Sequence, residues 1–276
     1  MAVLNDIEKD FIEFLSTRNG TAIEKLEETY LGLRARFGFG GDGYRELCEK
    51  VLDLHTLIYD SGDETQLIEV YKRHELLSVL RFISYSYMMD KRPAHRLEKS
   101  LKRLIKNDPY PVDLSKTKSE RMADEARFLV ENAGGAPFVV DYGCGLAYLS
   151  FQIAELHPSA KVCLVDIDTL NLRFAEYRFK KRNLDVQAIT ITKESLYPKL
   201  PEHNICIATE VIEHVKDPTA LYENITASLR PGGVLMGDFS DHEPDTFHVS
   251  HRLCGIRERV DKEFAVIGKN IYKKLA

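Results

Sequence analysis

The sequence has few cysteines, and their arrangement points neither to a disulfide framework nor to a zinc site. An odd number, five among 276 residues, occurs at Cys48, Cys144, Cys163, Cys206 and Cys254. None of them has the short spacing of a zinc ligand set, and three fall within or beside predicted buried strands. We therefore expect reduced thiols, as in a cytoplasmic protein.

The chain also lacks a long apolar run and a net positive charge. No stretch approaches the roughly eighteen apolar residues of a membrane-spanning helix, and residues 1–10 contain no apolar core of a signal peptide. The formal net charge is −5, so the chain as a whole has no basic footprint for nucleic acid or anionic membrane. We expect a cytoplasmic protein without membrane insertion, and a homodimer is left open.

The most informative stretch is an apolar run that ends in Asp-x-Gly-x-Gly, at residues 139–145. It predicts a buried strand that stops in a tight turn and opens a helix. Gly143 and Gly145 can adopt positive φ and have no Cβ, so a nucleotide-like ligand can rest against the backbone. A nicotinamide-binding fingerprint would have glycine at position 141. The carboxylate of Asp141 instead suits a ligand with positive charge, such as S-adenosylmethionine.

A second strand, predicted over residues 161–166, ends in an acid about twenty residues after the glycine turn. At this separation the carboxylate of Asp166 is expected to reach the ribose hydroxyls of an adenosine ligand at the switch point of a doubly wound sheet. Asp168 is the alternative, but it better fits the N-cap of the helix that follows and runs to about Arg182. We therefore assign Asp166 to the ribose and Asp168 to the cap.

With the Glu-Val-Ile-Glu-His stretch at residues 210–214 and the Leu-Arg-Pro-Gly-Gly turn at residues 229–233, residues 117–276 resemble the class I S-adenosylmethionine-dependent methyltransferases. The four motifs stand in the order and spacing of that family. Two positions depart from it. Ala147 replaces a common third glycine, and Glu194 is the best candidate for the acid that the resemblance implies beside the adenine amino group.

The expected fold is an α/β fold with a Rossmann-like, seven-stranded doubly wound sheet and a C-terminal antiparallel hairpin, preceded by an all-α N-terminal domain. Helical periodicity covers residues 6–17, 21–37, 44–59, 64–89 and 92–106. Strands are expected near residues 138–141, 161–166, 186–191, 204–209, 234–239, 263–268 and 270–274. We divide the chain into a helical domain (1–106), a proline-containing linker (107–118) and a methyltransferase-like domain (119–276).

Three ligand-type side chains follow the strand predicted near 204–209, namely Glu210, Glu213 and His214. One interpretation is a Mg or Mn site, because two carboxylates and an imidazole suit such ions better than a structural zinc. The stretch resembles ubiquinone-pathway O-methyltransferases and small-RNA 2′-O-methyltransferases, in which a later histidine, here His248 or His251, completes the metal ligands. The other interpretation is metal-free, as in many methyltransferases with the same residues, where the glutamate caps a helix and the histidine lines the pocket.

The sequence therefore predicts a methyltransferase that acts on a small-molecule acceptor, at oxygen, with His214 as general base and His248 as the second candidate. Glu213 is expected beside His214, and Glu210 beside the cofactor or the metal. An RNA 2′-O-methyltransferase and a non-catalytic S-adenosylmethionine-binding protein are the alternatives. Residues 1–106 are expected to cover the acceptor site or to serve oligomerisation, so that deleting them preserves much of the cofactor affinity.

Overall fold

The computed structural model describes residues 4–37, 43, 64–73, 75, 78–80, 82–83, 86, 115–239 and 253–276. The predicted linker prolines at 109 and 111 and the helices expected over 44–59 and 92–106 lie outside these ranges, so the proposed domain boundaries stay predictions. Within the described ranges, no helix combines the length and apolar character needed to cross a membrane.

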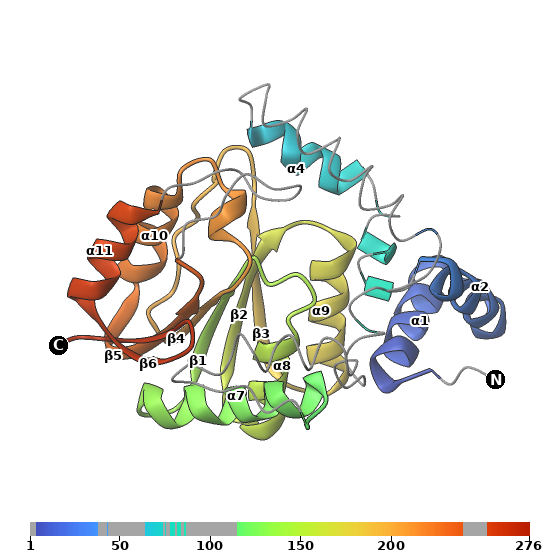
Figure 1. Ribbon diagram of the computed structural model, residues 1–276. Helices are drawn as coiled ribbons and strands as arrows, with labels where there is room; N and C mark the ends of the chain where they lie inside the picture. The colour runs from blue at the N-terminus through green and yellow to red at the C-terminus, as the bar shows by residue number, and fades with distance from the viewer. Residues whose placement is uncertain are drawn as a thin grey trace.

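A seven-stranded sheet in the order β3-β2-β1-β4-β5-β7-β6 occupies the centre of the molecule (Figure 1). The first five strands pair in parallel, and β7 is antiparallel to both of its neighbours, β5 and β6. The strands are β1 (Phe138–Tyr142), β2 (Lys161–Ile167), β3 (Asp185–Ile191), β4 (His203–Ala208), β5 (Leu229–Gly237), β6 (Phe264–Gly268) and β7 (Ile271–Lys274). The predicted seven-stranded doubly wound sheet with a terminal hairpin is confirmed, and the order reverses between β1 and β4.

Strand β5 differs from its expected bounds, because it begins at Leu229 rather than near residue 234. The glycines that predicted a turn instead form an irregularity inside the strand. Pairing with β4 shifts register between His203 and Ile205, and Gly232 has φ 74°. A Cβ on Gly233 would lie 2.9 Å from the Arg230 carbonyl oxygen, so only glycine fits there without a local shift. The two glycines therefore form a bulge within β5, and not a turn that precedes the strand.

Helices cover both faces of the sheet. Alternate strand residues such as Val139 and Leu164 are buried with α7 (Lys118–Ala133), α8 (Tyr148–Leu156) and α9 (Leu170–Lys181). Their neighbours in the strands, such as Val140 and Cys163, are buried on the other face with α10 (Pro218–Ala227) and α11 (Cys254–Glu263). Because successive side chains of a β-strand point to opposite faces of the sheet, these strands contribute to both apolar layers.

In the N-terminal region, the described residues include helices α1 (Asp6–Asn19), α2 (Ile23–Phe37) and α4 (Glu64–Arg73). They confirm the helical character expected in these parts of the N-terminal region. Helix α1 lies beside α9, far from it in the sequence (Figure 1). The Phe11 ring, which is fully buried, stacks on Phe82 with centroids 4.0 Å apart and meets Phe174 of α9 edge-on at 5.0 Å.

Ion pairs add to this contact between α1 and α9. The buried carboxylate of Asp10 lies 2.8 Å from Lys181 Nζ and 2.7 Å from an Arg182 guanidinium nitrogen. Lys181 Nζ also donates to Glu13 at 2.6 Å, and the Tyr177 hydroxyl donates to the same carboxylate at 2.7 Å. Because these partners are at least 164 residues apart in the chain, the N-terminal helices are fixed to the sheet region by tertiary contacts and not by a tether alone.

Replacing Phe11 by alanine is expected to lower the free energy of unfolding by about 3–5 kcal/mol, because the ring is fully buried and its removal leaves a cavity between α1 and α9. Urea unfolding monitored by circular dichroism measures the change. The control is Ile23→Ala, since this side chain is 43% exposed and should change stability by less than about 0.5 kcal/mol. Equal effects of the two substitutions would contradict the packing role of Phe11.

Candidate functional site

The glycine turn after β1 has a left-handed backbone, with φ 64° at Gly143 and φ 50° at Gly145. The two glycines serve different purposes. A Cβ on Gly143 would overlap the Val211 side chain, so this glycine allows the loop after β4 to approach the turn. A Cβ on Gly145 would meet no atom within 4 Å. Open space therefore borders the backbone at Gly145, which is what a ligand resting against the turn requires.

Asp166 lies at the end of β2 and its carboxylate bridges to the glycine turn. It accepts the Gly145 N–H at 2.6 Å and the Ile167 N–H at 2.7 Å. The turn and the second strand thus meet at one carboxylate, and its contact with a ribose stays a prediction. Charge-assisted hydrogen bonds of this kind fix the orientation of the carboxylate.

Asp141 is only 5% exposed and accepts a hydrogen bond from the Ser150 hydroxyl of α8. Burial raises the pKa of Asp141 to about 7, the Ser150 hydrogen bond lowers it, and the negative charge of Asp166 raises it further. A carboxyl group in this state changes charge near neutral pH, and a nearby positive charge would favour its ionised form. Ser150 is absent from the sequence-based site, and its only signal was a hydroxyl in the first turn of the helix that follows the glycines.

The assignment of Asp168 to the helix cap is wrong. The N-cap of α9 is Thr169, whose side chain accepts the Leu172 N–H at 3.5 Å. Thr169 has the extended backbone of a cap, with φ −117° and ψ 169°, directly before the first helical residue. Asp168 lies one residue too early and instead pairs with Arg173, at 2.8 Å for each of two hydrogen bonds. This pair lowers the pKa of Asp168.

The loop after β4 carries the Glu210, Glu213 and His214 side chains, and a 3₁₀ turn spans Ile212–His214. Glu210 is exposed and has a left-handed backbone with φ 56°, which is unusual for glutamate. Glu213 is 1% exposed, and one of its carboxylate oxygens lies 4.0 Å from His214 Nε2. The contact of Val211 with Gly143 means that this loop and the glycine turn are adjacent.

The metal interpretation gains no support from the described residues. Among them, no three His, Cys, Asp or Glu side chains are grouped closely enough to hold a metal ion. Glu210, Glu213 and His214 therefore do not form such a group by themselves. His248 and His251, predicted as further ligands, lie outside the described residues.

Glu194 lies in the loop after β3 and is exposed. Hydrogen bonds from its own backbone N–H and from Thr192 lower the pKa of its carboxyl group. The neighbouring Lys193 lies 3.5 Å from Glu69 of α4. A helix of the N-terminal region therefore contacts the loop in which the adenine-facing acid was predicted, at the same edge of the sheet as Asp166.

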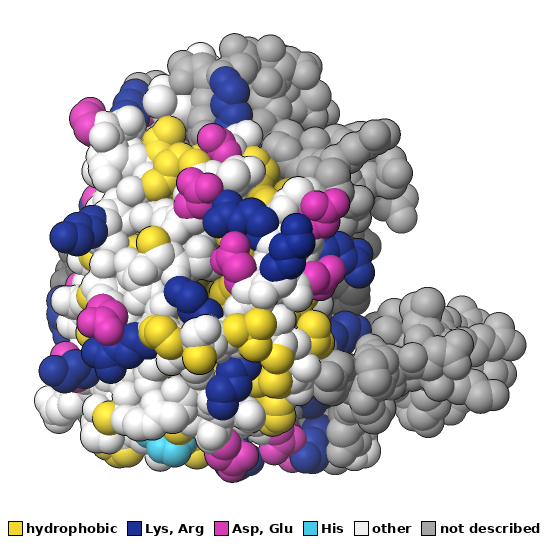
Figure 2. Space-filling view, turned by 90° about the vertical axis from the view of Figure 1, so that its left-hand side faces the viewer, with side chains coloured by type: hydrophobic (Ala, Val, Ile, Leu, Met, Phe, Trp, Pro, Cys, Tyr) yellow, Lys and Arg dark blue, Asp and Glu magenta, His cyan; other side chains and the backbone are white. Residues whose placement is uncertain are grey.

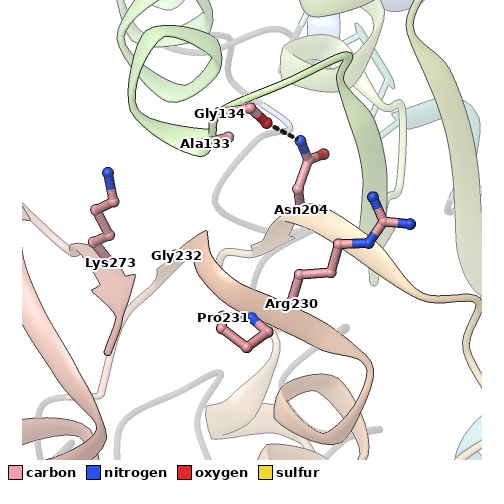
Figure 3. A pocket seen from close by; sticks show the side chains of 7 residues that line it. All are labelled: Ala133, Gly134, Asn204, Arg230, Pro231, Gly232 and Lys273. Carbon is pink, nitrogen blue, oxygen red and sulfur yellow. Dashed lines mark hydrogen bonds between the residues drawn. The ribbon is translucent and has the colours of Figure 1, made fainter. Parts of the chain in front are cut away.

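A separate hollow of about 390 Å³ lies at the opposite end of the sheet, where β4 and β5 begin (Figure 3). Its lining residues are Ala133, Gly134, Asn204, Arg230, Pro231, Gly232 and Lys273. The Asn204 amide is used internally, because it donates to Gly134 O at 2.6 Å and accepts the Phe138 N–H at 2.7 Å. Arg230 pairs with Glu202 at 2.8 Å. Two of the polar side chains that line this hollow are therefore already bonded within the protein. The hollow is also remote from the predicted site.

Residues 140–235 match the family model of the methyltransferase domain. The chain is 26% identical over 129 residues to malonyl-[acyl-carrier protein] O-methyltransferase from Acetivibrio thermocellus, a match that covers 46% of this chain and 44% of that protein. It is 31% identical over 115 residues to ubiquinone biosynthesis O-methyltransferase from Caulobacter vibrioides, covering 40% of this chain and 45% of that protein. The alignments therefore span less than half the length of these two curated relatives.

Among solved structures, an O-methyltransferase family protein from Burkholderia thailandensis aligns with a TM-score of 0.42 and 12% identity. The alignment covers 58% of this chain and 60% of that chain. A similarity at this level carries no inference about function.

The sheet order, the glycine turn and the matched region define a nucleotide-binding α/β domain of the methyltransferase type. The part of the chain that contains residues 140–235 is a class I S-adenosylmethionine-dependent methyltransferase domain.

Ala147 generates a prediction about stability. It is buried at the N-cap of α8 with φ 51° and ψ 40°, a left-handed conformation that costs an alanine about 1–2 kcal/mol. Ala147→Gly should therefore raise the free energy of unfolding by about 0.5–1 kcal/mol, or at least leave it unchanged despite the greater chain entropy of glycine. Thermal and urea unfolding measure this change.

The matched control is Ala123→Gly, in the interior of α7, where ordinary helical geometry predicts a loss of about 0.5–1 kcal/mol. A loss of the same size at both positions would show that Ala147 is not strained.

Proposed function

We propose that this protein transfers the methyl group of S-adenosylmethionine to a hydroxyl oxygen of a small-molecule acceptor. The observation that carries the proposal is the contact between Gly143 and Val211, because it puts the cofactor turn beside the loop that holds Glu213 and His214. The names of the O-methyltransferase relatives support oxygen as the methylated atom.

In this proposal the glycine turn binds the cofactor at its open side, next to Gly145. The Asp166 carboxylate exchanges part of its contact with the turn for the two ribose hydroxyls. Asp141, buried behind the turn, balances the positive charge of the methionine part of the cofactor. Glu194 takes the adenine amino group, and Glu210 lies at the edge of the same pocket.

The sulfonium of S-adenosylmethionine supplies a methyl group that is already activated, so the protein mainly has to align the acceptor and remove a proton. Alignment alone can contribute about 7–11 kcal/mol. His214 is the proposed base: it takes the hydroxyl proton while the acceptor oxygen forms its bond to the methyl carbon and the carbon–sulfur bond breaks. The Glu213 carboxylate, 4.0 Å from the His214 ring, stabilises the protonated imidazole. His248 is kept as the second candidate base on the resemblance alone.

The two alternative functions receive no specific support. The face in Figure 2 carries Lys and Arg side chains interspersed with Asp and Glu, without a broad basic patch for RNA among the side chains described there. RNA modification would predict binding that weakens steeply with salt. A non-catalytic protein would bind the cofactor without any turnover.

Asp166→Ala should weaken binding of S-adenosylhomocysteine by about 1.5–3 kcal/mol, because charge-assisted hydrogen bonds to the ribose are lost. Isothermal titration calorimetry measures the affinity. Asp168→Ala is the matched control: it removes the same charge two residues away, where the carboxylate pairs with Arg173, and should leave the affinity nearly unchanged. Loss of affinity in the control alone would reverse the assignment of the two acids.

Cofactor affinity should also depend on pH through Asp141. Its raised pKa of about 7 means that the carboxyl is protonated below neutrality in the free protein, while a bound positive charge favours the ionised form. Binding therefore releases a proton, and affinity should rise by up to about tenfold per pH unit below pH 7 and level off above it. Calorimetry between pH 5.5 and 8.5 in wild type and Asp141→Asn, which lacks the titrating group, gives the comparison. A wild-type affinity that does not change with pH would contradict the placement of Asp141 beside the positive charge of the cofactor.

His214→Gln should reduce turnover by about 10²–10⁴-fold through loss of the base, with nearly unchanged affinity for S-adenosylhomocysteine. Transfer of label from methyl-labelled cofactor into a metabolite extract measures turnover.

Full wild-type activity in the presence of a chelator would support the metal-free mechanism. Activity that is lost in chelator and restored by Mg or Mn would instead favour Glu210, Glu213, His214 and His248 as metal ligands.

A further inference from the structure

We propose that the N-terminal helices complete the cofactor site by holding its two binding segments, with Leu146 and Leu170 as the positioning residues. The inference rests on the proposed function, since it concerns the same cofactor. It differs from the expectation that residues 1–106 only cover the acceptor and can be deleted with little loss of cofactor affinity.

One apolar cluster joins the N-terminal helices to the cofactor segments; we call it the N-terminal cluster. Seven of its ten buried members lie between residues 11 and 83, and the other three are Leu146, Leu170 and Phe174. The cluster is therefore built mainly by the helical region, and the methyltransferase domain contributes three side chains to it.

Leu146 belongs to the glycine turn itself. It directly follows Gly145, which borders the open space and donates to Asp166, and its side chain is only 6% exposed. Its neighbours Gly145 and Ala147 both have left-handed backbones, with φ 50° and φ 51°. A turn with a strained alanine keeps its shape only where surrounding contacts hold it. Leu146 supplies such a contact, because it is buried in the N-terminal cluster, most of whose members belong to the helical region.

Leu170 provides the same connection for the second segment. It is the first residue of α9, four positions after Asp166, and is 3% exposed within the N-terminal cluster. The path from the ribose acid to the cluster is short, because only Ile167, Asp168 and the cap residue Thr169 lie between them. Each of the two cofactor segments thus has one leucine buried against the helical region.

The position of the helical region is itself fixed by polar contacts. Asp10 of α1 pairs with Lys181 at 2.8 Å and with Arg182 at 2.7 Å, near the C-terminal end of α9. Phe11 contacts Phe174 in the first half of the same helix. Helix α1 is therefore attached along α9, and loosening α1 disturbs the packing of Leu170 and Leu146. A site whose segments are held before binding loses less conformational entropy when the ligand arrives.

The test compares the affinity of full-length variants for S-adenosylhomocysteine by calorimetry, at a temperature where circular dichroism shows each variant to be folded. Leu146→Ala and Phe11→Leu should each weaken binding by about tenfold, within the usual range of coupling between sites. Phe11→Leu is the informative variant, because this ring belongs to the N-terminal helices and is not one of the proposed cofactor contacts. Leu146→Met, which keeps the side-chain volume, should restore most of the affinity.

Leu229→Ala is the matched control, since Leu229 is 2% exposed but lies at the start of β5, at the opposite end of the sheet. It should lower stability without changing affinity. If wild type binds and the Leu146 and Phe11 variants bind as tightly as wild type, the inference is overturned. It is equally overturned if Leu229→Ala weakens binding as much as they do, because the effect is then general destabilisation. Absence of binding in wild type would instead reject the proposed function itself.

Discussion

The left-handed turn at residues 143–147 is the constraint on which the rest of the site depends. Gly143 admits Val211 from the loop after β4, Gly145 donates to Asp166 at the end of β2, and Leu146 is buried among the N-terminal helices. The loop after β4, the end of β2 and the N-terminal cluster therefore all involve residues of this one turn. A change in the backbone of this turn would alter all three contacts together. The backbone conformation of the turn therefore affects the site more than any single contact does.

Two buried carboxylates differ in the hydrogen-bond and ion-pair partners that the protein gives them. Asp10, 5% exposed, has Lys181 and Arg182 as close cationic partners, and it joins two helices. Asp141 is equally buried, but its side-chain hydrogen-bond donor is the neutral Ser150 hydroxyl, and burial raises its pKa to about 7. A buried acid without a cationic partner is destabilising when ionised, and such groups are concentrated at binding sites. The contrast supports Asp141 as the residue that awaits a positively charged ligand.

Local sequence patterns predicted the strands, the terminal hairpin and the glycine turn well, because each depends on residue periodicity or on glycine at a fixed place. They failed where neighbouring residues compete, as for the cap at Thr169 instead of Asp168, and where glycines formed a bulge in β5 instead of a turn. They could not predict the contact of Phe11 with Phe174 or the burial of Leu146 in the N-terminal cluster, since helical periodicity does not identify the element against which an apolar face packs. The roles of Glu194, Glu210 and His248 and the domain boundaries stay predictions.

The packing of α1 on α9 also has a consequence for the order in which the protein forms during synthesis. Phe174 is translated about 160 residues after Phe11, which at roughly 5–20 residues per second corresponds to a delay of about 8–30 s. Until then α1 lacks the aromatic surface of α9, although Phe82, which stacks on Phe11, has already been made. Nascent chains of this protein should therefore expose the apolar face of α1 to chaperones until α9 has been made, so that α1 reaches its final place long after its own synthesis.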